Sequence, residues 1–394
     1  MNASALDIDP FADEFLADPW PDLETVREAA PVVFLPRYQV WAVARYAEVV
    51  RVLREARHFS SASGIGYVDV HSGNAWRTPS IVLEVDKPEH TRTRRILSRI
   101  LSETVLARLA GHLERSAEEL VSRVLDKGEF DAVTELAEPF PVGVLSEAVG
   151  LRAPDPAKLL GYGAMAFDGN GPPNARFQHA VADPDGIVPW IDAQCERASL
   201  LPAGFGAQLY AEVDAGRISE AEARLLVRSL FSAGIDTTVS ALGFAVMLFA
   251  QNPGEWAKLS AHPSKAKNAF EEVLRIQPPF VSFFRTTTDT VPLGDVVLPD
   301  RAKVLVLLAG AARDPRRWTE PDRFDIDRDT SGQVSFGYGI HRCVGQTLAR
   351  LEGACMLKAL IPRVKEWELC GTPVVRMNNT VRGLERLPVR VVPE

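Results

Sequence analysis

The chain has 394 residues, of which 46% are hydrophobic and 24% are charged, and these proportions are ordinary for a globular protein with a sizeable core. Its formal net charge of −8 argues against a protein that binds nucleic acid or anionic membranes, because such proteins are usually basic overall. The four cysteines are too scattered for a disulfide scaffold and are not spaced like a zinc site. We therefore expect a reduced, cytoplasmic protein.

The start of the chain and its apolar runs bear on membrane attachment. Residues 1–22 are acidic, contain prolines, and lack a basic stretch followed by an apolar one, so we expect neither a signal peptide nor a membrane anchor. The longest apolar run, residues 239–250, is shorter than the ~20 residues that a membrane span needs. This run predicts a buried core helix.

Taken in chain order, the patterns of apolar and turn-forming residues predict mostly helices. The Gly- and Ser-rich residues 60–79 predict a long loop, and loops of that length often form the wall of a binding site. Residues 152–176 are broken by prolines and glycines, which fits a helix, a loop and a helix. The other helices are expected at residues 21–30, 46–56, 90–101, 104–126, 132–150, 219–251, 263–276 and 344–364.

Fewer segments have the composition of β-strands. They are a short hairpin within 31–43, strand-like pieces at 290–298 and 303–310, and a hairpin at 374–393. We find no internal repeat and no linker that separates two cores. The sequence therefore predicts one mainly α domain over residues 1–394, with a small β portion mainly at 31–46, 289–308 and 373–392.

The strongest motif is FGYGIHRCVG at residues 336–345, where a predicted helix opens. Gly337 and Gly339 permit a tight loop, and Gly345 lets the start of the helix approach a flat partner closely. Cys343 lies just before the helix N-terminus, where backbone N–H groups and the helix dipole favour a thiolate. A thiolate in such a place is typical of the axial ligand of a haem iron.

Residues 336–345 resemble the haem-binding loop of the cytochrome P-450 family, and the resemblance extends over nearly the whole chain. It implies the P-450 fold, with a large helical part and a small β-rich part around a buried haem. It also implies haem b (iron protoporphyrin IX) as cofactor and O2 as co-substrate. Cys343 would bind the iron, and Phe336, Gly337 and Gly345 would lie beside the haem.

Two further groups of residues match the family. Glu272 and Arg275 lie three apart on a predicted helix and so share a face. Together with Arg323 in the sequence Pro-Asp-Arg-Phe at 321–324, they resemble a buried Glu–Arg–Arg triad that braces the haem loop. Arginine and histidine suit the haem propionates because they form charge-assisted hydrogen bonds with carboxylates. The resemblance assigns this role to His90, Arg94, Arg285 and His341.

The long predicted helix contains the sequence Ala-Gly-Ile-Asp-Thr-Thr at residues 233–238. A carboxylate beside two hydroxyls is poor helix chemistry, and such a conflict between local propensity and global pattern often marks a functional site. By resemblance, Asp236 would relay protons from solvent and Thr237 would hydrogen-bond the oxygen that the enzyme activates. The hydroxyls could also bond to the preceding helical turn and bend the helix. Peroxide-dependent relatives lack this pair, so we expect O2 and two electrons as inputs.

The electrons are expected to come from other proteins, because the chain has no room for a flavin or iron–sulfur domain. The resemblance implies a 2Fe–2S ferredoxin and its NAD(P)H-dependent reductase. Ferredoxins are acidic, so a basic patch should face them. The candidates are Arg92, Arg95, Arg99 and Arg342. We expect a monomer without a nucleic-acid or membrane partner.

The substrate is predicted from the expected pocket lining. Leu83, Ala233 and three aromatic residues, Phe167, Phe280 and Phe283, favour a flat, apolar guest. The sequence also resembles a bacterial subgroup that oxidises para-substituted benzoates and O-demethylates 4-methoxybenzoate. By that resemblance, four polar residues would hold the substrate carboxylate: Arg77, Ser80, Arg228 and Ser232.

Two positions depart from the subgroup. Asn170 replaces an aromatic residue and Phe280 replaces a smaller aliphatic one, so an amide could bind a phenol or methoxy oxygen. We therefore predict a monooxygenase for aromatic compound catabolism that O-demethylates a methoxylated aromatic, either 4-methoxybenzoate or an alkylguaiacol. Three alternatives stay open: Arg77 and Arg228 make only structural pairs, the chain hydroxylates another small metabolite such as a terpene, or it is a non-catalytic haem sensor.

Overall fold

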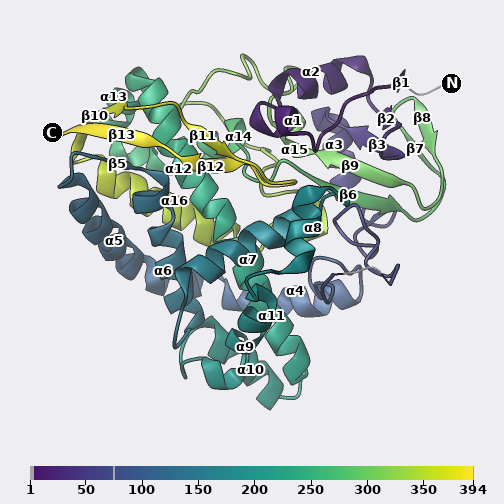
Figure 1. The fold of residues 1–394 in the computed structure, drawn as a ribbon, viewed down its shortest axis with the longest axis horizontal. Helices are drawn as coiled ribbons and strands as arrows, with labels where there is room; N and C mark the ends of the chain where they lie inside the picture. Colours follow the sequence, from purple (N-terminus) through teal and green to yellow (C-terminus); the bar gives the residue numbers. More distant parts are fainter. Residues whose placement is uncertain (1–3, 74–75, 394) are drawn as a thin grey trace.

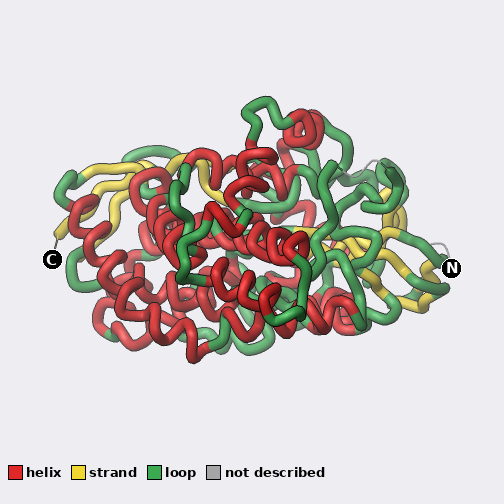
Figure 2. Tube along the Cα trace, turned by 90° about the horizontal axis from the view of Figure 1, so that it is seen from below, coloured by secondary structure: helices red, strands yellow, loops and turns green. Residues whose placement is uncertain are grey.

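The computed structural model describes residues 4–73 and 76–393. Helices fill the middle and lower left of the molecule, and strands lie toward its two ends (Figure 1). Seen from below, the strands near the N-terminus and those near the C-terminus lie on opposite sides of the helices (Figure 2). The mainly α architecture with small β-sheets is as predicted.

Most predicted helices are present, and their bounds are as follows. The helices of the described residues are α1 (Asp13–Ala17), α2 (Trp20–Ala29), α3 (Tyr46–Arg54), α4 (Glu89–Ile100), α5 (Glu103–Leu125), α6 (Pro139–Val149), α7 (Pro156–Asp168), α8 (Ala175–Ala182), α9 (Ile187–Gln194), α10 (Phe205–Asp214), α11 (Glu220–Gly234), α12 (Asp236–Gln251), α13 (Pro253–Ala261), α14 (Ala266–Ile276), α15 (Leu308–Ala312) and α16 (Gln346–Leu360). Of these, α1, α9, α10, α13 and α15 were not predicted, and residues 308–310 of α15 were expected to belong to a strand. A single π-helical turn, η1 (Val133–Ala137), precedes α6.

The strands form one large sheet and three small ones. The six-stranded sheet has the order β1 (Ser4–Ala5), β2 (Val33–Leu35), β3 (Val40–Val43), β9 (Lys303–Leu307), β6 (Ser282–Thr287) and β4 (Phe59–Ser60). The others pair β10 (Val364–Leu369) with β13 (Pro388–Pro393) and β5 (Glu129–Asp131), β11 (Val374–Arg376) with β12 (Gly383–Arg386), and β7 (Val291–Leu293) with β8 (Val296–Leu298). Strands β1, β4, β5, β6 and β10 lie outside the predicted β ranges.

The six-stranded sheet is buried on both faces. Along β9, Val304 and Val306 pack into one hydrophobic cluster with Phe283, whereas Leu305 and Leu307 pack into another on the opposite face. This alternation follows from the two-residue period of a strand. The sequence therefore reads as a continuous apolar run, as expected for a strand covered on both sides.

The long helix predicted at residues 219–251 is divided into α11 and α12. Its start is a capping box, in which the Ser219 side chain and the Glu222 side chain each bind the other residue's backbone. By length and composition the whole stretch could cross a membrane, but most of it is buried inside the protein. It is therefore the core helix that its sequence predicts.

Candidate active site

Cys343 ends a loop whose shape depends on glycine. Gly337 and Gly339 both have a φ of +69°, a conformation that residues with a side chain rarely adopt. The Cys343 amide donates to the Phe336 carbonyl at 2.8 Å and closes the turn. A Cβ atom at Gly339 would lie 2.3 Å from the Leu53 carbonyl oxygen, so this glycine also lets the loop pack against α3. The loop thus fixes the position of Cys343 just before α16.

The surroundings of the Cys343 sulfur favour its anionic form, apart from burial. Burial raises the pKa of the Cys343 thiol, whereas the backbone amides of Gly345 and Gln346 and the guanidinium groups of Arg94 and Arg350 act to lower it. Helix N-terminal amides and nearby cations are the groups that stabilise a thiolate. The site therefore suits a sulfur that is deprotonated when it coordinates a metal ion.

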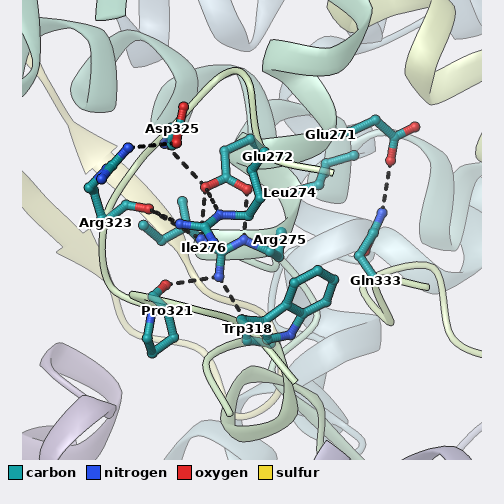
Figure 3. Close-up of polar contacts among 12 residues, drawn as sticks. Glu271, Glu272, Leu274, Arg275, Ile276, Trp318, Pro321, Arg323, Asp325 and Gln333 are labelled. Atoms are coloured by element: carbon teal, nitrogen blue, oxygen red, sulfur yellow. Dashed lines mark hydrogen bonds and ion pairs between the residues drawn. The ribbon is translucent and has the colours of Figure 1, made fainter. Parts of the chain in front are cut away.

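A fully buried ion pair on α14 supports the segment that leads to this loop (Figure 3). Arg275 donates to both carboxylate oxygens of Glu272, at 2.7 and 2.8 Å, and both side chains are 0% exposed. The remaining Arg275 nitrogen donates to the carbonyls of Ala312 and Pro321, each at 2.9 Å. This pair therefore fixes the end of α15 and the irregular segment at Pro321 against α14.

The prediction that Arg323 completes the triad is wrong. Its side chain is 55% exposed and pairs with Glu320 and Asp325. The second arginine on Glu272 is Arg328, which is 11% exposed and donates to Glu272 Oε1 at 3.0 Å. Arg323 contributes only its backbone carbonyl, which accepts from Arg328 at 3.0 Å. The exposed position of Arg323 leaves its charge in solvent, where it has no buried carboxylate to neutralise.

Further contacts connect α14 with the loop itself. The Ser335 hydroxyl donates to the Leu274 carbonyl at 2.6 Å, and the Gln333 amide donates to Glu271 at 3.0 Å. Arg350 on α16 also pairs with Glu271, and its guanidinium lies 4.4 Å from the centre of the Phe336 ring. Both ends of the Cys343 loop are therefore attached to α14.

A buried group of basic side chains lies near the loop. The rings of His90 and His341 are 4.4 Å apart, and none of their four nitrogens has a hydrogen-bond partner among the described residues. Burial is the main cause that lowers the pKa of His90 to about 4. Arg285 is buried as well, and its one side-chain hydrogen bond within the described residues goes to the Phe284 carbonyl at 2.9 Å. These unmatched donors suit an anionic ligand.

The junction of α11 and α12 shows the predicted competition between hydroxyls and helix. The Thr237 hydroxyl donates to the Ala233 carbonyl at 2.8 Å, and that of Thr238 donates to the Gly234 carbonyl at 3.3 Å. Ser240 does the same with the Asp236 carbonyl at 2.8 Å. Such bonds back to the preceding turn compete with the backbone hydrogen bonds of the helix. The helix divides into α11 and α12 at this point. Ala233 is exposed here although most of the helix is buried.

Three phenylalanines, from α7, from the segment after α14 and from β6, lie together. The Phe280 ring stacks on Phe283, with centroids 5.2 Å apart and an interplanar angle of 21°. It also contacts Phe167 of α7, with centroids 5.5 Å apart. The three rings form one aromatic cluster, in which Phe167 and Phe283 are buried, and Leu83 packs in the same cluster as Phe280 and Phe283.

Comparison with known proteins agrees with this geometry. A family model described as Cytochrome P-450 matches residues 266–386. The chain is also 46% identical to Cytochrome p450 CYP199A2 of Rhodopseudomonas palustris over 389 residues, which are 98% of this chain and 94% of that protein. This chain belongs to the cytochrome P-450 family.

Two further likenesses place the whole chain in the P-450 family. It is 33% identical to Cytochrome P-450 107B1 of Saccharopolyspora erythraea over 366 residues, which cover 89% of each protein. The solved structure of CYP109Q5 from Chondromyces apiculatus matches with a TM-score of 0.82 at 30% identity and covers 98% of this chain and 99% of that one. The protein is thus a haem monooxygenase with haem b as its cofactor and O2 as co-substrate.

The residues of this P-450 fit a haem. Cys343 would hold the iron, and His90 and His341 with Arg94 and Arg285 would bind the two propionates; His341 Nε2 also lies 3.9 Å from Asp86 Oδ1, beyond hydrogen-bond distance. Parts of Cys343, Ala233 and Thr237 remain exposed although they lie deep in the fold, as expected of surfaces that a cofactor or substrate covers. When bound, the haem with its thiolate ligand supplies the activation of dioxygen.

The predicted carboxylate-binding residues of this P-450 are largely engaged with the protein. Arg77 donates to both oxygens of Glu84, at 2.7 and 3.1 Å, and the pair is buried. The Ser80 amide adds a third bond to Glu84 at 2.8 Å, while the Ser80 hydroxyl accepts from the amides of residues 82 and 83. The charge of Arg77 is therefore balanced within the protein.

The other two residues predicted to bind the substrate carboxylate also contact protein groups. Arg228 donates to the Thr78 carbonyl at 2.8 Å and lies 3.6 Å from Asp192. The Ser232 hydroxyl donates to the Ser229 carbonyl at 3.3 Å. The structure brings all four residues to the region where α11 meets the loop after residue 76, but it gives each of them a protein partner.

Asn170 lies at the end of a contact between this loop and α7. The Trp76 ring covers Gly169, where a Cβ atom would lie 2.5 Å from the indole, and Trp76 Nε1 donates to the Gly169 carbonyl at 3.1 Å. Asn170 follows directly and is buried, and no hydrogen bond of its side-chain amide is found within the described residues. Contact between this amide and a substrate stays a prediction.

The predicted basic patch is partly neutralised. Arg92 pairs with Glu222, and Arg99 pairs with Glu212 at 2.9 Å. Glu212 also pairs with Arg217. A surface groove nonetheless runs along α4. It is lined by Lys87, Pro88, Thr91, Arg92, Arg95, Ile96, Arg99 and Arg217.

Several site residues were missed in the sequence because no local motif marks them. Glu84 and Arg328 complete ion pairs with residues that were predicted. Glu352 on α16 is fully buried, and burial raises its pKa to about 8, although the Thr238 hydroxyl donates to it at 3.4 Å. Arg376 lies 2.7 Å from the proposed proton relay Asp236. Only Glu352 could have been sought by asking which buried helix faces carry a lone charge.

Proposed function

We propose that this P-450 O-demethylates a methoxylated aromatic compound. The observation that carries the proposal is the aromatic cluster in which the Phe280 ring lies 5.5 Å from that of Phe167 and 5.2 Å from that of Phe283. Offset and tilted aromatic contacts at such distances favour a further flat ring over a branched aliphatic guest. An aromatic substrate would bind against these rings with its methoxy group toward the haem.

The proposed reaction replaces one C–H bond of the methyl group by C–OH. O2, two electrons and two protons give one oxygen atom to the substrate and release the other as water. The resulting hydroxymethyl ether is a hemiacetal, and its C–O bond to the ring oxygen breaks to give a phenol and formaldehyde. Asp236 would bring the protons and Thr237 would donate a hydrogen bond toward the oxygen. Cys343 would bind the iron, and His90, Arg94, Arg285 and His341 would fix the haem.

The balanced charges beside the aromatic rings support a neutral substrate. A substrate carboxylate needs a cation that is free to bind it, but Arg77 already binds Glu84 with two hydrogen bonds. A methoxyphenol needs only a hydrogen-bonding group, which the unpartnered amide of Asn170 supplies. We therefore favour an alkylguaiacol-like compound over 4-methoxybenzoate.

Electrons would come from a 2Fe–2S ferredoxin and an NAD(P)H-dependent reductase. Within the predicted patch, Arg92 and Arg99 already pair with glutamates, so Arg95 and Arg342, both exposed, would make the main contacts with an acidic partner. The chain would act as a single-domain monomer in the cytoplasm.

A spectral titration of the ferric holoprotein tests the substrate class. We expect 4-propylguaiacol to convert the haem from low to high spin, and 4-methoxybenzoate to do so only weakly. Turnover with ferredoxin, reductase and NADH should then yield formaldehyde and a phenol in equal amounts. A strong shift with the benzoate alone would restore Arg77, Ser80, Arg228 and Ser232 as carboxylate ligands. No shift with either compound would contradict the proposed substrate class and favour a terpene-type hydroxylase or a sensor.

A further inference from the structure

Arg376 connects the surface of the protein with the buried carboxylate of Asp236. It is the last residue of β11, and in the antiparallel pair with β12 it lies opposite Gly383. Its Nη1 is 2.7 Å from Asp236 Oδ1. The Arg376 side chain is 21% exposed and that of Asp236 is 0% exposed. The partly exposed Arg376 side chain therefore reaches the start of α12, which is buried.

Two glycines make room for this contact. A Cβ atom at Gly383 would lie 2.4 Å from Ser240 Oγ and 3.4 Å from Arg376 Nη2. A Cβ atom at Gly163 of α7 would lie 3.0 Å from the Asp236 Cβ. A methyl group at Gly383 would push α12 away from β12, and one at Gly163 would crowd Asp236. The close approach of Arg376 and Asp236 thus depends on small residues on both sides.

The contact is a single ion pair without supporting hydrogen bonds. Neither Asp236 oxygen accepts a well-directed hydrogen bond within the described residues, because the approach of Arg376 is short but poorly aligned. The Arg376 Nε and Nη2 atoms are also buried without a partner there. A carboxylate held by one charge contact can be released more easily than one that accepts several hydrogen bonds.

Other acids surround the same guanidinium. Glu138 precedes α6, and burial raises its pKa while Arg376 lowers it. Asp168 ends α7, and burial raises its pKa to about 6, against the lowering effects of the Asn379 amide, Arg176 and Arg376. Asp236 acts on both of these acids. Arg376 is thus the cation shared by three carboxyl groups that come from three different elements.

We infer that Arg376 is a positioning residue for proton delivery, which holds the Asp236 carboxylate on the side of the β11–β12 hairpin where solvent protons enter. A proton that arrives past Arg376 converts Asp236 to its neutral form and weakens the ion pair. Asp236 is then free to turn toward Thr237. This inference rests on the roles proposed above for Asp236 and Thr237, and it is independent of the identity of the substrate.

The test compares three variants of the holoenzyme with a substrate that shifts its spin state. Arg376→Gln removes the charge, Arg376→Lys retains it, and Arg386→Gln is the control. Arg386 lies on the same hairpin, is exposed, and stands 3.8 Å from its own carboxylate partner, Asp131. For each variant, kcat, KM, the product formed per NADH and the solvent deuterium isotope effect on kcat are measured.

We expect Arg376→Gln to lower kcat about tenfold while KM stays unchanged. This loss is smaller than the loss expected when a general acid itself is removed, because Arg376 acts only through Asp236. Product per NADH should fall, hydrogen peroxide should accumulate, and the solvent isotope effect should rise. Arg376→Lys should restore most of the coupling, and Arg386→Gln should behave as the wild type. Wild-type coupling and isotope effect in Arg376→Gln would overturn the inference, as would uncoupling of the folded Lys variant.

Two further measurements separate this inference from a purely structural role and from the proposed function. Hydrogen exchange of residues 233–240 in the holoenzyme should be faster in Arg376→Gln than in Arg376→Lys, because the carboxylate is no longer anchored. If the Gln variant fails to bind haem, the product formed per NADH by the Lys variant alone tests the inference. Wild-type coupling in Asp236→Asn would contradict the proposed proton relay itself, whereas uncoupling there with normal Arg376→Gln would contradict only the inference.

Discussion

Two buried carboxylates, Glu272 and Asp236, show how differently the two sides of the site are supported. Glu272 accepts from Arg275 twice, from Arg328 and from the Asp325 amide. Asp236 has one poorly aligned contact with Arg376. Both are fully buried, so burial alone does not decide how firmly a charge is held.

The difference matches what each side has to do. The thiolate loop must keep one position through every turnover, and a carboxylate with four donors gives it several independent constraints. In the proposed role of Asp236, its side of the site would pass protons, which requires a group that changes its partner. Arg77–Glu84 resembles the Glu272 side, since Glu84 accepts two hydrogen bonds from arginine and one from the Ser80 amide.

The largest expected effect comes from breaking the firmly held pair. Arg275→Ala leaves Glu272 charged and buried, which should lower the free energy of unfolding by about 3–5 kcal/mol. The exposed Arg323→Ala should change it by less than ~0.5 kcal/mol. Urea denaturation of the holoproteins measures both. Equal losses in the two variants would restore Arg323 to the triad.

Next in size is the pH dependence contributed by Glu352. Because burial raises its pKa to about 8, the folded state binds a proton that the unfolded state releases above about pH 4.5. This contribution to stability is therefore present at low pH and is lost as pH rises through 8. Glu352→Gln should remove a loss of a few kcal/mol between pH 6 and 9. Glu366→Gln, on the exposed face of β10, is the control, and an identical pH profile in both would contradict the prediction.

A smaller effect is expected when the charge of Arg77 is released. Glu84→Gln keeps the shape of the side chain but leaves the guanidinium uncompensated, so 4-methoxybenzoate should bind about tenfold more tightly. Binding of 4-propylguaiacol should stay the same, because it has no carboxylate. Spin-state titrations measure both dissociation constants, with Glu89→Gln as an exposed control. If neither ligand responds, Arg77 does not reach the substrate.

The smallest effect is expected at Asn170. Asn170→Leu removes one hydrogen bond to a neutral group, which should weaken binding of 4-propylguaiacol by about threefold to tenfold. The matched ligand 4-propylanisole lacks the second oxygen and should bind equally well to both proteins. A loss for both ligands would assign Asn170 to packing instead of recognition.

The sequence predicts best where function depends on a short stretch of chain. The Cys343 loop and the hydroxyls of α12 each lie within ten residues, and the structure places both as expected. Arg328 was missed because residues 319–335 are irregular, so no helical or strand period tells which arginine turns inward. Glu84 and Arg376 were missed for another reason, since their partners depend on how the loop after residue 76 and the C-terminal hairpin pack on the helices.

Strands β6 and β10 were not predicted for a related reason. β6 is buried at all six positions, so it lacks the alternation that identifies a strand with one exposed face. β10 directly follows α16 and is recognisable only by its pairing with β13, the last strand of the chain. Neither the full burial of β6 nor the pairing of β10 can be deduced from a short stretch of sequence.

The contact of Trp76 with Gly169 has a practical consequence. An indole lying on bare backbone is sensitive to any separation of the loop from α7, since water would then reach its ring. Its emission should therefore report a separation of this loop from α7, in real time and without a label. The absence of a side chain at Gly169 thus makes one of the seven tryptophans an optical probe of the contact between this loop and α7.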